Sequence, residues 1–529
     1  MKRRIVFLLS FLMLAQITWA QIDHVGRYES AYNWSMDDFL VIPNGEAGML
    51  IARAEKNIAD RNFTLWLKHL NKDFEVEWTD SIKVPKTFFI KGYDYNGARN
   101  YIFLQDKSET RDLKVIRIDP INNSIQQFEP RRLTEMDVTN FEIIQNSAII
   151  AGYIDGRPAA FVLNMDTKKL VTLTNVYMNK SQMLEVKINA DSVTFNVAVS
   201  VPNYSRDRTV QINTYDYEGN PVRDYKIQTD LNHNLMTATT SSIFNVEQVV
   251  VGLYNYKQGT SPSGVYVNHV DRTGQQTMTY LPFGRFNEFF KHEGEKRAQK
   301  LKEKSLSAHE KGSFYRYRTE ALFRKMVETD NELIIFGEYY KPWGGGSNSL
   351  ASSRRVSGSE QWFPSNIGSD GIPGNNLNGV NFTDVKEYEF SHAWAFALDH
   401  SGNLLWDSGV EIDESIEGSI SSFGEFAYSE GQAIYSNYYD EELIVHPLKS
   451  ELDSLETIRA PLALLNEDDE LVFERDGYGG ILKWYQNKYL VFGIQHVRPT
   501  DKSQPTRKVF FVNGVSIGPE FIAKDLKGQ

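Results

Sequence analysis

The chain has no cysteine among its 529 residues. This absence excludes disulfides, thiolate metal sites, a cysteine nucleophile and the lipidated cysteine of a bacterial lipoprotein. A chain of this length can be stabilised by its core alone, because the buried fraction of the surface rises with size. We therefore expect the protein to be stabilised by its hydrophobic core alone.

Catalytic and metal-binding motifs are also missing. The sequence has no Gly-x-Ser-x-Gly nucleophile turn and no His-Glu-x-x-His zinc motif. The ten histidines are scattered, and only His392 and His400, which flank a predicted strand, come near a ligand-like spacing. The acidic segments 466–470 and 369–376 lack the alternating oxygen ligands of a calcium loop. No cofactor and no metal are therefore expected.

The N-terminus has the pattern of an export signal. Lys2, Arg3 and Arg4 precede an apolar stretch from Ile5 to Ala15, and Thr18-Trp19-Ala20 offers small residues for a signal peptidase. The apolar stretch is short for a bilayer span, so we predict a cleaved signal peptide over residues 1–20, with an uncleaved anchor as the alternative. The mature chain, residues 21–529, should then contain no transmembrane segment.

The charge balance limits the partners and the compartment. The net charge is −12, and the three basic residues near the N-terminus leave −15 for the rest of the chain. Nucleic acid and anionic lipid demand a basic surface, so neither is expected as the main partner. Export without cysteine suits a bacterial periplasm, cell surface or extracellular space, and the sequence does not separate these.

A repeat of roughly 50 residues runs along the chain and joins short hydrophobic strands by polar turns. One anchor is an apolar strand ending in glycine, at residues 148–152, 249–252, 333–337 and 489–493. The other is an apolar strand entering an aspartate-led turn, at Asp119, Asp166, Asp216, Asp271 and Asp399. Short strands at a fixed period are typical of a β-propeller. The sequence thus predicts an all-β fold, a single propeller of four-stranded blades over residues 21–529.

The number of repeat units predicts eight blades. The alternative is seven blades, if the weakest unit is an extension at the edge of another blade and not a blade of its own. The last unit, from about Gly479 to Ile517, has only three clear strands. We expect a strand between Val25 and Trp34 to complete it, because an open end would expose unpaired strand edges.

Two segments around the sixth unit break the repeat. Residues 286–311 are rich in Lys, Glu, Ala, Gln and Leu, with opposite charges three and four residues apart, which predicts an inserted, solvated and locally basic helix. Residues 343–383 are dominated by Gly, Ser and Asn and predict a long flexible loop inside the sixth blade. Such a loop is either a flexible excursion or a binding loop.

One segment carries a family resemblance. Residues 395–406 combine an apolar strand, the turn Asp399-His400-Ser401-Gly402 and a strand ending in Trp406. This order resembles the repeat of quinoprotein-like propellers, in which Asp caps the turn, Gly takes a positive φ and Trp docks against the neighbouring blade. The resemblance implies the fold but not the quinone cofactor, because the vicinal cysteines and the metal-site pattern are missing. The chain as a whole resembles secreted, uncharacterised propeller proteins of bacterial envelopes, which implies no reaction.

A candidate ligand-binding surface lies in and beside the sixth unit. Aromatic side chains next to arginines can stack sugar rings or bind carboxylates. The candidate residues are Tyr339, Tyr340, Trp343, Arg354, Arg355, Trp362 and Trp394. The alternative is that Tyr339 and Trp394 pack between blades while Arg354 and Arg355 are a solvated pair.

These observations favour a non-catalytic binding or scaffold protein of the bacterial envelope, which presents a propeller face to protein or glycan ligands. The alternative is a carbohydrate-active enzyme, a glycoside hydrolase or lyase, with acidic residues at the propeller centre. The sequence contains 69 acidic residues and singles out no catalytic pair. A third possibility is an assembly factor that docks membrane-protein precursors by strand addition at blade edges.

Overall fold

The chain is built mainly of β-strands in a computed structural model that describes residues 22–517 with gaps. The gaps are residues 34–36, 57–58, 107–111, 131–134, 203–207, 231, 244–245, 257–260, 314, 316, 318–319, 344–386, 418–423, 430, 440, 450–456, 473–478 and 502. The predicted signal peptide lies outside the described residues. None of the described helices is long and apolar enough to cross a membrane.

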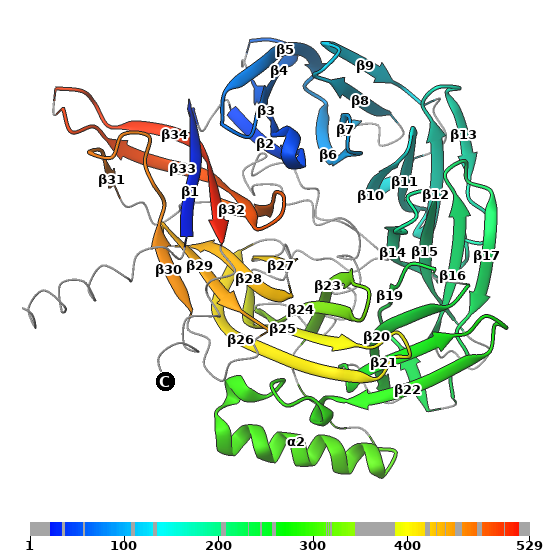
Figure 1. Ribbon diagram of the computed structural model, residues 1–529. Helices are drawn as coiled ribbons and strands as arrows, with labels where there is room; N and C mark the ends of the chain where they lie inside the picture. Colours follow the sequence, from blue (N-terminus) through cyan, green and yellow to red (C-terminus); the bar gives the residue numbers. More distant parts are fainter. Residues whose placement is uncertain are drawn as a thin grey trace, which may run out of the picture. The chain divides into compact units, whose positions relative to one another are not determined.

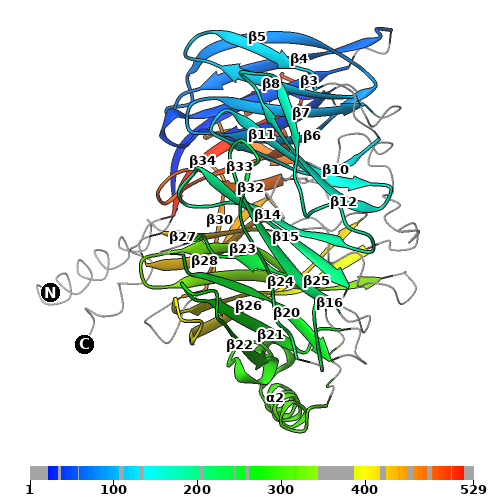
Figure 2. The same cartoon turned by 90° about the vertical axis from the view of Figure 1, so that its right-hand side faces the viewer.

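The described strands form eight antiparallel sheets, each of which is a meander of four main strands (Figures 1 and 2). This is an eight-bladed β-propeller, and it confirms the predicted fold class and the count of eight blades. The chain divides into two compact units. The larger unit is Trp34–Asn71 and Val76–Phe426, and the smaller is Met1–Asn33, Lys72–Glu75 and Ala427–Gln529.

The larger unit contains blades one to six. Blade one is β2 (Asp37–Pro43), β3 (Met49–Glu55), β4 (Asn62–Leu70) and β5 (Val76–Pro85), and blade two is β6 (Phe88–Tyr95), β7 (Asn100–Asp106), β8 (Leu113–Asp119) and β9 (Ser124–Phe128). Blade three is β10 (Asp137–Ile144), β11 (Ser147–Ile154), β12 (Arg157–Asn164) and β13 (Lys169–Thr172), and blade four is β14 (Gln182–Ile188), β15 (Thr194–Pro202), β16 (Arg208–Asp216) and β17 (Pro221–Lys226). Blade five is β18 (His233–Leu235), β19 (Thr239–Thr240), β20 (Gln248–Tyr256), β21 (Gly264–Val270) and β22 (Gln276–Pro282), and blade six is β23 (Glu320–Glu328), β24 (Leu333–Trp343), β25 (Glu387–Leu398) and β26 (Leu404–Glu417).

The remaining two blades belong to the smaller unit, except for the first two residues of β27. Blade seven is β27 (Glu425–Ser429), β28 (Gln432–Tyr439), β29 (Glu442–Pro447) and β30 (Ile458–Pro461). Blade eight is β31 (Glu470–Val472), β32 (Gly479–Lys483), β33 (Lys488–Arg498), β34 (Arg507–Ile517) and the N-terminal strand β1 (Ile22–Ala31). Strand β1 runs antiparallel to β34, with Ile22 opposite Ile517, so the predicted completion of the last blade is confirmed.

The N-terminal strand is fixed by a buried arginine. The Arg27 guanidinium donates to Glu29 Oε1 at 2.8 Å, to Asn513 Oδ1 at 2.7 Å and to Gln495 Oε1 at 2.8 Å. Arg507 Nη1 approaches the other oxygen of Glu29 at 2.9 Å. The side chains of Arg27 and Glu29 are only 4% and 5% exposed, so this network joins β1, β33 and β34 in the interior of the blade.

The repeated glycines lie where the first strand of a blade is irregular. Gly152 faces the register shift between Val138 and Asn140, and a Cβ at this position would overlap the carbonyl oxygen of Asp137. Gly252 faces the interruption between β18 and β19, where a Cβ would overlap the carbonyl oxygen of Thr237. At Gly152 and Gly252 the glycine anchors are therefore set by the close approach of two backbones.

The turns at Asp216, Asp271 and Asp399 have the predicted chemistry, whereas in the turn at Asp166 the N–H groups of Asp166 and Thr167 donate to Asn164 Oδ1 instead. In blade six, Asp399 Oδ1 accepts hydrogen bonds from the N–H groups of Ser401 at 2.9 Å and Asn403 at 2.8 Å, and Gly402 has a φ of +87°. The turns that begin at Asp216 and Asp271 repeat this arrangement. Trp406 Nε1 donates to Glu332 Oε2 at 3.0 Å within its own blade, so docking of this indole on a neighbouring blade stays a prediction.

The insertion between blades five and six contains helix α2 (Glu295–Glu310), which lies inside the predicted range of 286–311 (Figure 1). Before it come the 3-10 turns η2 (Phe283–Arg285) and η3 (Lys291–Glu293). Four buried phenylalanines anchor the insertion to the core of blades five and six: Phe283, Phe286, Phe289 and Phe290. A Cβ on Gly284 would lie 2.5 Å from the carbonyl oxygen of Lys302, so the helix approaches η2 closely. The predicted loop 343–383 falls between β24 and β25, and residues 344–386 are outside the described residues.

Candidate functional site

The predicted ligand-binding residues occupy different environments. Tyr339, Tyr340 and Trp394 are at most 1% exposed. Tyr339 stacks on His392 with ring centroids 4.2 Å apart, and Trp394 meets Phe286 edge-on at 4.7 Å. Trp343 is the last residue of β24, while Arg354, Arg355 and Trp362 lie outside the described residues. The three buried rings are core packing in this conformation, and a ligand-binding role for the set stays a prediction.

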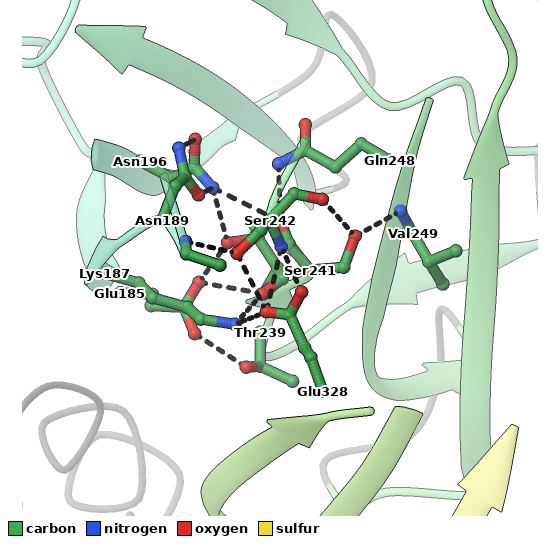
Figure 3. Close-up of polar contacts among 12 residues, drawn as sticks. Glu185, Lys187, Asn189, Asn196, Thr239, Ser241, Ser242, Gln248, Val249 and Glu328 are labelled. Atoms are coloured by element: carbon green, nitrogen blue, oxygen red, sulfur yellow. Dashed lines mark hydrogen bonds and ion pairs between the residues drawn. The ribbon is translucent and has the colours of Figure 1, made fainter. Parts of the chain in front are cut away.

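A polar network joins the first strands of blades four, five and six (Figure 3). Its charged members are Glu185 and Lys187 of β14 and Glu328 at the end of β23. Between them runs the segment Thr239–Ser242, which starts as the two-residue strand β19. Because β19 is so short, backbone groups of this segment are available to side chains from the flanking blades.

Glu185 is the buried carboxylate of the network and is 7% exposed. Its Oε1 accepts from Thr239 Oγ1 at 2.6 Å, and its Oε2 accepts from the N–H and Oγ1 of Thr240 at 2.8 and 2.7 Å. Burial raises the pKa of this carboxyl, against the opposing effects of Lys187 and of the threonine donors. Both carboxylate oxygens are thus engaged by fixed donors of one neighbouring segment.

Lys187 and Glu328 form the ion pair of the network. Lys187 Nζ lies 2.6 Å from Glu328 Oε1 and also donates to the carbonyl oxygen of Thr240 at 2.6 Å. The Ser242 N–H lies 2.9 Å from each oxygen of Glu328. The two charged side chains are 21% and 23% exposed, so this pair is where the network meets solvent.

A layer of amides and hydroxyls supports the charged groups. Asn196 Nδ2 donates to Asn189 Oδ1 at 2.8 Å and to Thr240 Oγ1 at 3.0 Å. Gln248 Nε2 donates to the carbonyl oxygen of Ser241 at 2.9 Å. Asn196 is 0% exposed and Gln248 is 1% exposed, so the layer lies in the interior of the protein.

Similar contacts join the first strands of other blades. Lys91 of β6 lies 3.5 Å from Asp137 of β10, and Lys325 of β23 lies 3.0 Å from Glu425 at the start of β27. Asp94 of β6 accepts from the Ile143 N–H of β10 at 2.6 Å. Burial raises the pKa of Asp94 to about 6. Polar side chains of the first strands therefore repeatedly contact one another within the larger unit, which includes Glu425.

A second polar cluster lies between blade five and helix α2. His233 Nδ1 is 2.7 Å from Asp230 Oδ2, and its ring stacks on Tyr280 at 4.0 Å. His309 of α2 meets the hydroxyl of Tyr256 through Nδ1 at 3.1 Å. Burial and the nearby His233 lower the pKa of His309. The contact of His309 with Tyr256 attaches the helix to the aromatic side chains that surround His233.

The carboxylates of the network in Figure 3 are poorly placed for acid–base catalysis. An acid–base catalyst must place a carboxyl group within hydrogen-bond reach of the reacting atom. Glu185 is buried with its oxygens engaged, and Glu328 is held by Ser242 and Lys187. Among the described residues, no group of three or more His, Asp or Glu could hold a metal ion. His392 stacks on Tyr339, whereas His400 contacts the carbonyl oxygen of Thr329, so these two histidines have different surroundings.

No motif in the sequence predicts this network. The signal that could have identified it is the run Thr239-Thr240-Ser241-Ser242, four consecutive hydroxyl residues at the start of a repeat unit. The partners Glu185 and Glu328 are 143 positions apart and become neighbours only through the blade arrangement.

Comparisons with known proteins concern the fold. No protein-family description matches the chain, and no curated protein matches it. Among solved structures, the polysaccharide lyase Uly1 is similar with a TM-score of 0.39 and 7% identity, over 81% of this chain and 90% of that one. The β-propeller domain of the Trilobed protease from Pyrococcus furiosus is similar with a TM-score of 0.35 and 8% identity, over 79% of this chain and 100% of that one. A prolyl endopeptidase is similar with a TM-score of 0.37 and 8% identity, over 82% of this chain and 50% of that one. Likeness at this level carries no argument about activity.

Proposed function

We propose that this protein is a non-catalytic binding or scaffold protein of the bacterial envelope, whose propeller presents a rigid surface to a protein or glycan ligand. The observation that carries the proposal is the engagement of Glu185 and Glu328 by donors of the protein itself. A carboxylate with its oxygens occupied by fixed donors stabilises a fold better than it transfers protons.

The same contacts supply rigidity. Hydrogen bonds from Thr239, Thr240 and Ser242 fix Glu185 and Glu328 directly to the segment between them. A satisfied polar network in the protein interior holds its elements in one arrangement. Neighbouring blades that are fixed in this way present their loops at constant spacing, which lowers the entropic cost of binding a ligand.

Ligand-dependent thermal unfolding tests this proposal. The purified protein is heated with a panel of polysaccharides, cell-wall fragments and envelope-protein extracts, and the size of each polysaccharide is measured afterwards. A ligand at a hundred times its dissociation constant should stabilise the protein by about 2.7 kcal/mol. A shift in midpoint with an intact ligand is expected. Cleavage of a ligand that causes a shift would contradict the non-catalytic role.

A carbohydrate-active enzyme is the second candidate function, and one observation favours it. Glu185 has a raised pKa and shares a network with a second carboxylate, Glu328, beside the cation of Lys187. Glycoside hydrolases use a carboxyl group of raised pKa together with an ionised carboxylate. On this alternative, Glu185→Gln abolishes polysaccharide cleavage, while Glu425→Gln, which changes a carboxylate outside the network, leaves cleavage intact.

A further inference from the structure

The exposed face of helix α2 carries a row of unpaired lysines, which we call the lysine row: Lys296, Lys300 and Lys304. The three residues are exposed and are spaced four residues apart. None of them forms an ion pair or hydrogen bond with another described residue, whereas neighbouring Arg297 is paired with Glu293 at 2.9 Å. The predicted pairing of opposite charges along this helix is therefore present only at its N-terminal end among the described residues.

The arrangement does not serve the stability of the helix. Like charges four residues apart on a helix repel each other, and alternating signs would stabilise it instead. The acidic side of the exposed face repeats the same spacing with Glu295, Gln299 and Glu303, and Gln299 donates to Glu303 at 2.8 Å. The lysine row thus runs beside a row that consists of two glutamates and one glutamine.

The lysine row stands out against the charge of the whole chain. The net charge of the whole chain is −12, whereas residues 286–311 contain seven Lys or Arg and five Glu. The helix lies beside β22, the last strand of blade five, and is anchored through η2 (Figure 1). Attachment to blade five fixes the helix backbone, and with it the spacing of the three lysines, while their side chains extend into solvent.

We propose that the lysine row binds a linear acidic polysaccharide with one carboxylate on each sugar. An α-helix rises about 6 Å between residues four apart, so the row places three ammonium groups along about 12 Å. A chain of uronic acids carries carboxylates at a spacing of the same order. Lysine is a mobile, hydrated point charge, which suits carboxylates presented along a flexible polymer.

Other polyanions fit the row less well. Double-stranded DNA carries about one charge per 1.7 Å, and the acidic remainder of the protein repels so dense an anion. Insertion into a membrane surface needs large apolar side chains on the contacting face. The residues of this face between Glu295 and Lys304 are charged or amide side chains, apart from half-buried Ala298 and Leu301.

The inference rests on the proposed function, because it names the glycan class. The test measures binding of the full chain to polygalacturonate, to neutral dextran, to double-stranded DNA and to anionic lipid vesicles, at low and high salt. The variant replaces the lysine row by glutamine (Lys296→Gln, Lys300→Gln and Lys304→Gln together). The matched control replaces three exposed lysines of blades three and four by glutamine in the same way: Lys168, Lys169 and Lys226.

The expected result is salt-sensitive binding of polygalacturonate that falls about tenfold in the lysine-row variant, since each exposed ion pair contributes modestly. The control variant should bind like the wild type. Equal loss in both variants, or binding of DNA or vesicles as tight as that of polygalacturonate, would overturn the inference. Binding of dextran or another neutral glycan without polygalacturonate binding would overturn it and leave the proposed glycan-binding function standing.

Discussion

Replacing Gly252 by alanine tests whether the glycine anchors are set by backbone contact. A Cβ at Gly252 would overlap the carbonyl oxygen of Thr237 and lie 2.5 Å from Cε1 of Tyr266. Tyr266 is itself 0% exposed, so its ring has no free space to enter. A normal carbon–carbon contact needs about 3.5 Å, so the ring or β20 would have to move by about 1 Å.

The expected cost is at the upper end of overpacking, about 3 kcal/mol. Gly337→Ala should cost less, about 1–2 kcal/mol, because its Cβ would lie 2.8 Å from the carbonyl oxygen of Leu322 and 3.3 Å from Phe323. Gly409→Ala is the control, because the added Cβ meets its nearest atoms at 3.5 Å, an ordinary contact. None of these three glycines needs a positive φ, so the comparison isolates steric overlap.

The assay is thermal and urea unfolding of the three variants beside the wild type, followed by circular dichroism. The predicted order of stability is Gly409→Ala equal to the wild type, Gly337→Ala lower and Gly252→Ala lowest. If Gly252→Ala unfolds with the midpoint of Gly409→Ala, the repeated glycine does not report backbone contact, and our explanation of the repeat is wrong.

Three further predictions concern ionisable side chains. Arg27→Met should destabilise the smaller unit by about 3 kcal/mol, because Glu29, Asn513 and Gln495 lose a buried donor, and an unchanged unfolding midpoint would contradict this. Lys187→Met and Glu328→Gln should each lower the free energy of unfolding by about 1–3 kcal/mol, as measured in unfolding titrations. The double variant should lose less than the sum of the two single losses, whereas additive losses would mean that the pair is uncoupled. Burial, with the charge of Arg459, lowers the pKa of His446 to about 4. The neutral imidazole therefore contributes stability that is fully present above the unfolded pKa of about 6.5. This contribution, about 3 kcal/mol in total, is lost as the pH falls from about 6.5 through 4. In His446→Gln the acid-induced loss of stability should be smaller, and a pH profile of unfolding equal to that of the wild type would refute the assignment.

Local sequence signals predicted the parts of the fold that depend on local chemistry. The turn at Asp399 was predictable because aspartate accepts backbone hydrogen bonds at fixed offsets and Gly402 takes a positive φ. The completion of blade eight by the N-terminal strand was predictable from the three strands left in the last repeat. Helix α2 was predictable because residues 295–310 are good helix formers without proline.

The polar network was not predictable from one sequence. Glu185 and Glu328 are ordinary acidic residues among 69, and nothing in their local sequence distinguishes them. Their role depends on the short strand β19 of blade five. Because this strand ends at Thr240, the N–H groups of Thr240 and Ser242 are available to donate to Glu185 and Glu328. The burial of Tyr339 and Trp394 likewise follows from the aromatic insertion of Phe286 and Phe289, whose path the repeat pattern does not contain.

The measurement that tests the functional account most directly is the length of a polysaccharide after incubation with the protein. Wild type and Glu185→Gln are incubated with each polymer that shifts the unfolding midpoint, and chain length is followed by size-exclusion chromatography. The account predicts bound polymers of unchanged length with both proteins. Shortening by the wild type that is lost in folded Glu185→Gln would contradict it and would identify an enzyme.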